Sequence, residues 1–281
     1  MFIDPQLDAW LKTLTPLDIA DLTTAREASS RNQGGAEAVP AEWHGNLKVF
    51  RSEKGEGQSG PTIYNIHGGG FVLGSTTSDD PENTMLMDRL GATVVSPEYS
   101  LAPESPFPTA FHQCCEGLRW VADNIDSRPI IMGHSAGGGL AAVVAQWGVD
   151  NGIDVGGQIL IEPELDPTLL SKSMRTYEHG PVWTRANAVL SWQYYLGDKG
   201  DQPYATVREN PGVIPRTYII VNQSDPLRDE GIEYAQKLAD SGTPVTLKMY
   251  PGTVHGSMSC LQAEITQLAY EELCTALSCW P

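Results

Sequence analysis

The sequence has 281 residues, of which 41% are hydrophobic, so it can bury one large core, and α/β chains of this length commonly form a single domain. Its formal net charge is −17. A surface of this charge repels phosphate backbones and anionic lipid headgroups, which argues against nucleic acid and anionic membranes as partners.

Residues 1–45 precede the first predicted strand. Their apolar residues form an imperfect helical stripe: Leu7, Trp10, Leu11, Leu14, Leu17 and Ile19. The first residues lack the basic and apolar regions of a secretory signal, and the longest apolar stretch of the chain, 140–149, is too short to span a bilayer. We therefore expect a cytoplasmic location and no membrane partner.

From residue 47 onward, short apolar runs typical of buried strands alternate with helical patterns. The runs are 47–52, 62–66, 93–96, 130–132, 158–161, 217–221 and 245–250. This alternation predicts the α/β class, with a mostly parallel central sheet and helices on both faces. We expect a single domain over residues 1–281. Residues 1–45 and 166–215 do not fit the alternation, and we expect them to form a helical cap.

The strand predicted at 62–66 runs directly into His67-Gly68-Gly69-Gly70-Phe71. Glycines in this position let backbone N–H groups point at an oxygen that becomes negative when an acyl carbonyl is attacked. The run predicts an oxyanion hole made by the N–H groups of Gly68, Gly69 and Ala136. We expect His67 and Gly70 to support this loop, with His67 acting through hydrogen bonds and not through proton transfer.

A second motif follows the strand at 130–132, where Gly133-His134-Ser135-Ala136-Gly137 leads into a helix of small residues. Strand, sharp turn and helix are the context that a nucleophile elbow requires. Ser135 is therefore the predicted nucleophile. For its neighbour His134 we favour packing or hydrogen bonding of the turn over catalysis, because consecutive side chains at such a turn point in different directions.

Two further residues complete a predicted triad. Asp225 follows the strand at 217–221, and His255 follows the strand at 245–250. The order Ser135, Asp225, His255 is that of α/β-hydrolases. Other acids have simpler explanations: Asp229 and Glu230 suit a first helical turn, and ordinary loop hydrogen bonding accounts for the acids after the strand at 158–161, which are Glu162, Glu164 and Asp166.

Together these motifs resemble the hormone-sensitive-lipase-like family of esterases within the α/β-hydrolase fold. The matching segments are 67–71, 98–104, 133–138, 225–231 and 255–256. The resemblance also implies a lid built from the two cap segments. The chain departs from the family at His134, where an acidic residue is usual, and at Ser100, where an arginine is usual.

The expected activity is hydrolysis of short to medium acyl esters through an acyl-enzyme intermediate, with small-molecule esters as substrates and no metal or organic cofactor. A lactone, thioester or arylamide substrate stays open, and a non-catalytic small-molecule receptor is a weaker alternative because all three triad residues are present. A homodimer is compatible with the sequence. The five cysteines lack metal-ligand spacing and an even disulfide framework, so we expect free thiols: Cys114, Cys115, Cys260, Cys274 and Cys279.

Overall fold

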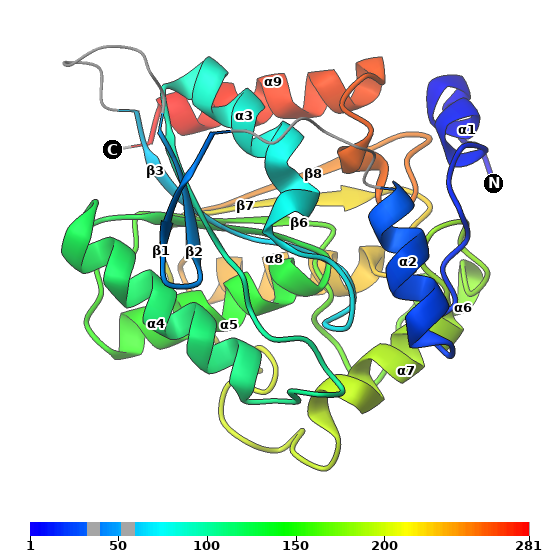
Figure 1. Cartoon of the computed structure of the whole chain (residues 1–281), viewed down its shortest axis with the longest axis horizontal. Coiled ribbons are helices and arrows are strands. Elements are labelled where there is room, and N and C mark those ends of the chain that lie inside the picture. The colour runs from blue at the N-terminus through cyan, green and yellow to red at the C-terminus, as the bar shows by residue number, and fades with distance from the viewer. Residues whose placement is uncertain (33–39, 52–59, 281) are drawn as a thin grey trace.

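The computed structural model describes residues 1–32, 40–51 and 60–280 (Figure 1). Its centre is an eight-stranded sheet in the order β1-β2-β4-β3-β5-β6-β7-β8. The two pairings at the β1 edge are antiparallel, and the remaining five are parallel. The strands are β1 (Glu42–His44), β2 (Leu47–Arg51), β3 (Thr62–Ile66), β4 (Thr93–Pro97), β5 (Ile130–His134), β6 (Gly157–Ile161), β7 (Thr217–Asn222) and β8 (Val245–Tyr250).

Helices cover both faces of the sheet, as Figure 1 shows. One face carries α4, α5 and α8, and the other carries α3 and α9. The helices are α1 (Pro5–Leu11), α2 (Leu22–Asn32), α3 (Asp80–Leu90), α4 (Thr109–Asn124), α5 (Ala136–Asp150), α6 (Lys172–Thr176), α7 (Arg185–Leu196), α8 (Arg228–Asp240) and α9 (Glu264–Ser278), with short 3₁₀ turns η1 (Thr76–Asp79) and η2 (Ser257–Ser259). The predicted α/β class, with a mostly parallel sheet, is confirmed.

The central strands are mostly apolar because both of their faces are buried. Successive side chains point to opposite faces. On β3, Ile63 joins the core under α3 and α9, while Tyr64 joins the core under α4 and α5. Val94 and Val95 on β4 divide in the same way. This double burial explains why the runs read from the sequence match the strands to within a few residues; Ser52, the last residue of the first predicted run, lies outside the described residues.

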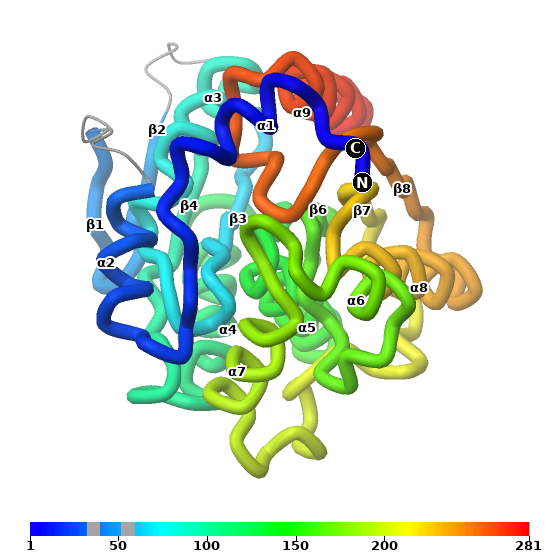
Figure 2. The backbone as a smooth tube through the Cα atoms, turned by 90° about the vertical axis from the view of Figure 1, so that its right-hand side faces the viewer, coloured from blue at the N-terminus to red at the C-terminus, as the bar shows by residue number. Residues whose placement is uncertain are grey.

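The two segments expected to form a cap lie at one end of the molecule (Figures 1 and 2). Residues 1–45 supply α1 and α2, and residues 166–215 supply α6 and α7. Asn187 on α7 joins them, since its side-chain amide donates to Leu17 O (3.0 Å) and accepts from the Ile19 N–H (3.4 Å). The end of the first segment differs from the expectation, because Glu42–His44 pairs with β2 as the edge strand β1.

All five cysteines are free, and Cys114 and Cys115 are buried on α4. Burial raises the pKa of both thiols, so they pack as small apolar groups. Within the described ranges, no helix combines the length and the apolar character needed to cross a membrane.

Candidate active site

Ser135 occupies a sharp turn between β5 and α5. Its φ of 51° and ψ of −121° lie in a region that non-glycine residues rarely adopt. The turn is held by hydrogen bonds from the Ser135 N–H to Ile161 O and from the Glu164 N–H to Ser135 O, both 2.9 Å. A Cβ on Gly137 would lie 2.1 Å from Ile66 O, so only glycine fits there. These features give the elbow expected from the sequence.

The loop after β3 lies directly against this turn. A Cβ on Gly68 would come within 3.5 Å of the Ser135 Cβ, and Gly69 has a φ of 118°. Within the described chain, the N–H groups of Gly68, Gly69 and Ala136 make no intramolecular hydrogen bond. Three free donors beside a serine hydroxyl are what an oxyanion requires.

His67 and its neighbours stabilise the glycine loop after β3. The His67 Nδ1–H donates to Gly68 O (2.8 Å), and the Tyr99 hydroxyl donates to His67 O (2.8 Å). The two rings stack with centroids 4.1 Å apart. Burial lowers the pKa of His67, which favours a neutral ring. These contacts fit an anchor and not a proton carrier. Gly70 packs against Trp183, where a Cβ would lie 2.3 Å from the indole ring.

The three predicted triad residues converge at the carboxyl ends of their strands. The Ser135 Oγ lies 3.0 Å from His255 Nε2, and His255 Nδ1 lies 2.9 Å from Asp225 Oδ2. All three side chains are buried. Asp225 Oδ1 accepts the Leu227 N–H (2.8 Å), which fixes the carboxylate at the start of α8. The two acids in the first turn of α8 point elsewhere: Asp229 accepts the Ser173 N–H, and Glu230 accepts the N–H groups of Leu165 and Asp166.

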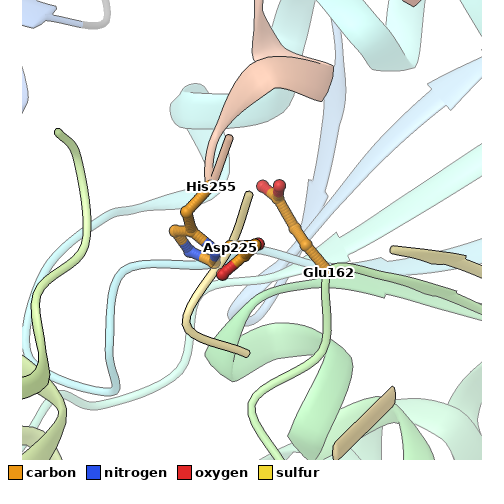
Figure 3. A group of neighbouring side chains, drawn as sticks. All are labelled: Glu162, Asp225 and His255. Carbon is orange, nitrogen blue, oxygen red and sulfur yellow. Dashed lines mark hydrogen bonds and ion pairs between the residues drawn. The ribbon is translucent and has the colours of Figure 1, made fainter. Parts of the chain in front are cut away.

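A further carboxylate, Glu162, lies beside Asp225 and His255 (Figure 3). It follows β6 with a φ of 44°, which is a strained value for a residue with a side chain. Its Oε2 accepts the Gly256 N–H (2.9 Å) and the side-chain amide of Asn222. The sequence favoured ordinary loop hydrogen bonding for Glu162, and Glu162 does make such hydrogen bonds. The sequence did not predict that its carboxylate would lie this close to the His255 imidazole.

Negative charge around His255 changes its acidity. Burial would lower the pKa of this imidazole, but the charges of Asp225 and Glu162 outweigh burial and raise its pKa to about 9. One atom each of Glu162, Asp225 and His255 lie within 4.8 Å of one another, close enough for a metal ion. These three side chains already have other partners. Glu162 Oε2 accepts N–H donors, and His255 pairs with Asp225, so the arrangement does not require a metal ion.

His134, next to the serine, points away from the triad. Its Nε2–H donates to both carboxylate oxygens of Glu82 on α3, at 2.8 and 2.9 Å, and Glu82 also accepts the Tyr270 hydroxyl. Burial would lower the pKa of His134, but Glu82 raises it to about 9. His134 therefore forms a buried ion pair, which supports hydrogen bonding over catalysis. Its partner Glu82 lies on α3 and not in the turn.

Ser100 is the other position at which the chain departs from the family pattern. It forms two hydrogen bonds with Gln113.

A cavity of about 260 Å³ opens above the serine. Both cap segments contribute to its wall. It is lined by Trp10, Leu14, Leu17, Ser29, Asn32, Gly68, Gly69, Gly70, Leu73, Gly74, Ser78, Asp79, Pro81, His134, Ser135, Glu162, Val182, Trp183, His255, Gly256 and Ser259. Ser135 therefore faces a partly enclosed, partly apolar space. Such a space suits a small organic substrate.

The fold and this site define an α/β-hydrolase. A family model described as the alpha/beta hydrolase fold matches residues 63–259, so the chain belongs to that family. The arylesterase of Saccharolobus solfataricus is 29% identical over 91% of this chain and 92% of its own length. Esterase LipI of Mycobacterium tuberculosis is 35% identical over 70% of this chain and 65% of its own length.

Solved structures agree with the sequence comparisons. A bacterial heroin esterase superposes with a TM-score of 0.91 at 34% identity, covering 98% of this chain and 97% of that one. An esterase of Pyrobaculum calidifontis superposes with a TM-score of 0.87 at 30% identity, covering 98% of both chains. The resemblance to hormone-sensitive-lipase-like esterases is therefore confirmed.

Proposed function

We propose that this carboxylic ester hydrolase cleaves short to medium acyl esters with Ser135 as nucleophile, His255 as general base and acid, and Asp225 as the residue that orients His255. The observation that carries the proposal is the continuous chain of contacts from Ser135 Oγ through His255 to Asp225, at 3.0 and 2.9 Å. The proposed oxyanion hole comprises the free N–H groups of Gly68, Gly69 and Ala136, with His67 and Gly70 as its support.

The geometry fits a two-step acyl transfer. Ser135 Oγ attacks the ester carbonyl as its proton passes to His255 Nε2, and the oxyanion accepts hydrogen bonds from the three backbone donors. Asp225 holds the His255 Nδ1–H and offsets the charge that develops on the ring. His255 then protonates the leaving alcohol, and a water molecule, deprotonated by His255, hydrolyses the acyl-enzyme. No step in this scheme calls for a metal or organic cofactor.

The size of the substrate follows from the cavity. About 260 Å³ is slightly below the usual range of roughly 300–1,000 Å³ for small-molecule sites, which favours compact acyl groups. Lactones, thioesters and arylamides use the same chemistry, but the relatives named esterases favour carboxylic esters. The intact contacts of Ser135, His255 and Asp225 disfavour a non-catalytic receptor. Three expectations stay predictions: a cytoplasmic location, a possible homodimer, and the lack of nucleic-acid and membrane partners.

The experiment that tests the nucleophile combines turnover with active-site labelling. We expect Ser135→Ala to abolish hydrolysis of p-nitrophenyl butyrate and labelling by a fluorophosphonate, while circular dichroism and the melting temperature show a folded protein. Ser100→Ala is the matched control, because Ser100 lies outside the cavity lining, and it should keep both signals. Wild-type labelling of Ser135→Ala would show that another residue is the nucleophile.

A further inference from the structure

One carboxylate in the wall of the cavity makes no hydrogen bond or ion pair with the described residues. Asp79 precedes α3 and lines the same cavity as Ser135. An aspartate at this position ordinarily accepts backbone N–H groups of the helix that it begins, but the Asp79 side chain accepts none. In the part of the chain that the structure describes, its Oδ2 is buried without any hydrogen bond. A buried polar atom left unpaired at a binding cavity points to a missing ligand group.

The charges next to Asp79 are already paired. Asp80 forms a buried ion pair with Lys48, at 2.7 and 2.8 Å, and Glu82 pairs with His134. Asp79 therefore forms no ion pair of its own among the described residues, and the charge of His134, which is already paired with Glu82, offsets only part of the effect of burial on its pKa. Burial raises the pKa of Asp79 to about 7, so a positive charge entering the cavity would favour its ionised form.

Aromatic rings form another part of the same wall. Trp10 of α1 and Trp183, from the segment before α7, both line the cavity. The Trp183 ring centroid lies 6.1 Å from that of His255, which places this indole beside the reacting groups. Tryptophan faces attract organic cations, and an aromatic wall combined with a carboxylate is a common way to bind an ammonium group. Among the described lining residues there is no lysine or arginine to attract an anionic substrate, and the two lining histidines, His134 and His255, are each paired with a carboxylate.

We propose that the cavity contains an ammonium subsite formed by Asp79 with Trp10 and Trp183, and that the preferred esters carry a protonated or quaternary amine away from the scissile carbonyl. The inference rests on the proposed ester hydrolysis and specifies its substrate class. Asp79 supplies the charge, the two indoles supply the apolar surface that an alkylated nitrogen needs, and Ser135 attacks the ester group.

A pair of esters that match in shape but differ in charge tests the subsite. Acetylcholine and 3,3-dimethylbutyl acetate differ by a quaternary nitrogen in place of a quaternary carbon. We expect the wild-type enzyme to show a higher kcat/KM for the cationic ester, and Asp79→Asn to lower the cationic-to-neutral ratio by about tenfold or more, because the variant removes the charged partner of the ammonium group. Asp123→Asn is the matched control. Asp123 is exposed on α4, so this variant removes the same net charge outside the cavity.

Binding measured without turnover separates this inference from the proposed function. Calorimetric titration of the Ser135→Ala variant with choline should give a lower Kd than titration with 3,3-dimethylbutan-1-ol, and adding Asp79→Asn should remove the difference. A ratio that Asp79→Asn leaves unchanged, or equal binding of the two alcohols, would overturn the subsite. Failure of the wild-type enzyme to cleave either ester would instead count against ester hydrolysis, and choline binding would then decide the subsite alone.

Discussion

At the scale of single residues, the proposed role of His255 as general base predicts that its surroundings set the pH dependence of the enzyme. The imidazole accepts the serine proton only when it is neutral. Burial opposes its charge, but Asp225 and Glu162 together raise its pKa to about 9, above the ordinary value of about 6.5 for histidine. Protonation therefore persists to higher pH, and kcat/KM should still be rising above pH 7.

Glu162→Gln isolates the contribution of the second carboxylate. A glutamine oxygen can still accept the Gly256 N–H, so the loop keeps its hydrogen bond while one negative charge is lost. We expect the acid limb of the kcat/KM profile to move down by about one pH unit, since a neighbouring charge shifts a pKa by roughly this amount or more. The measurement is kcat/KM for a soluble p-nitrophenyl ester from pH 5 to 10.

Glu164→Gln is the control for that shift. Burial raises the pKa of Glu164 to about 8, so this carboxyl is mostly neutral at pH 7 and adds the smaller charge near His255. Its replacement should move the limb less. Equal shifts in the two variants, or an unmoved limb in Glu162→Gln, would mean that Glu162 only shapes the loop.

At the scale of secondary-structure elements, the contacts of Arg26 form a clamp that fixes α2 to the loops after β3 and β4. Arg26 of α2 donates to Val72 O (3.0 Å) and Ala102 O (3.1 Å) and pairs with Glu104 at 2.7 and 2.8 Å. The hydrogen bonds from Arg26 lower the pKa of Glu104 to about 2. Glu104 therefore stays ionised at pH values below the ordinary glutamate pKa. The stabilisation from its pairing with Arg26 is fully present above that ordinary pKa and is lost as the pH falls through about 2.

Removing this clamp should loosen one wall of the cavity. Ser29 and Asn32 of α2 line the cavity, so we expect Arg26→Ala to raise the KM for p-nitrophenyl butyrate several-fold and to change kcat less, because the triad does not move. Arg31→Ala is the control, since the ion pair of Arg31 is with Glu27 on the same helix. Steady-state kinetics of both variants checks the prediction, and equal KM values in the two would contradict it.

The same scale shows what the sequence could and could not reveal. Strands such as β3 and β7 are buried on both faces, so their apolar runs are visible in the sequence. The edge strand β1 is exposed at all three residues, so no hydrophobic pattern marks it. The elbow and the glycine loop are local motifs and could be predicted. The pairing of Glu82 with His134 joins residues 52 positions apart on different elements, so no local pattern contains it.

At the scale of the whole molecule, the sheet positions the predicted catalytic residues, and the two cap segments line the cavity next to them. The carboxyl ends of β3, β5, β7 and β8 present the glycine loop, Ser135, Asp225 and His255 at one edge, as expected for α/β sheets. One cap segment precedes β2 in the chain and the other lies between β6 and β7, and the two meet through the hydrogen bonds of Asn187. In the proposed mechanism the reacting groups thus stand at the ends of the sheet strands, and both cap segments line the cavity beside them.

The volume beneath the cap predicts the acyl-chain profile of the enzyme. Each buried methylene adds up to about 0.8 kcal/mol of binding while it stays inside the cavity. A space of about 260 Å³ is filled after a few carbons, so kcat/KM should climb over the shortest chains and then fall. We expect p-nitrophenyl acetate, butyrate or hexanoate to exceed the dodecanoate and palmitate, measured below the aggregation limit of each ester. A maximum at twelve carbons or more, or activation by emulsified triglyceride, would mean that the cap opens into a longer channel and that the enzyme acts as a lipase.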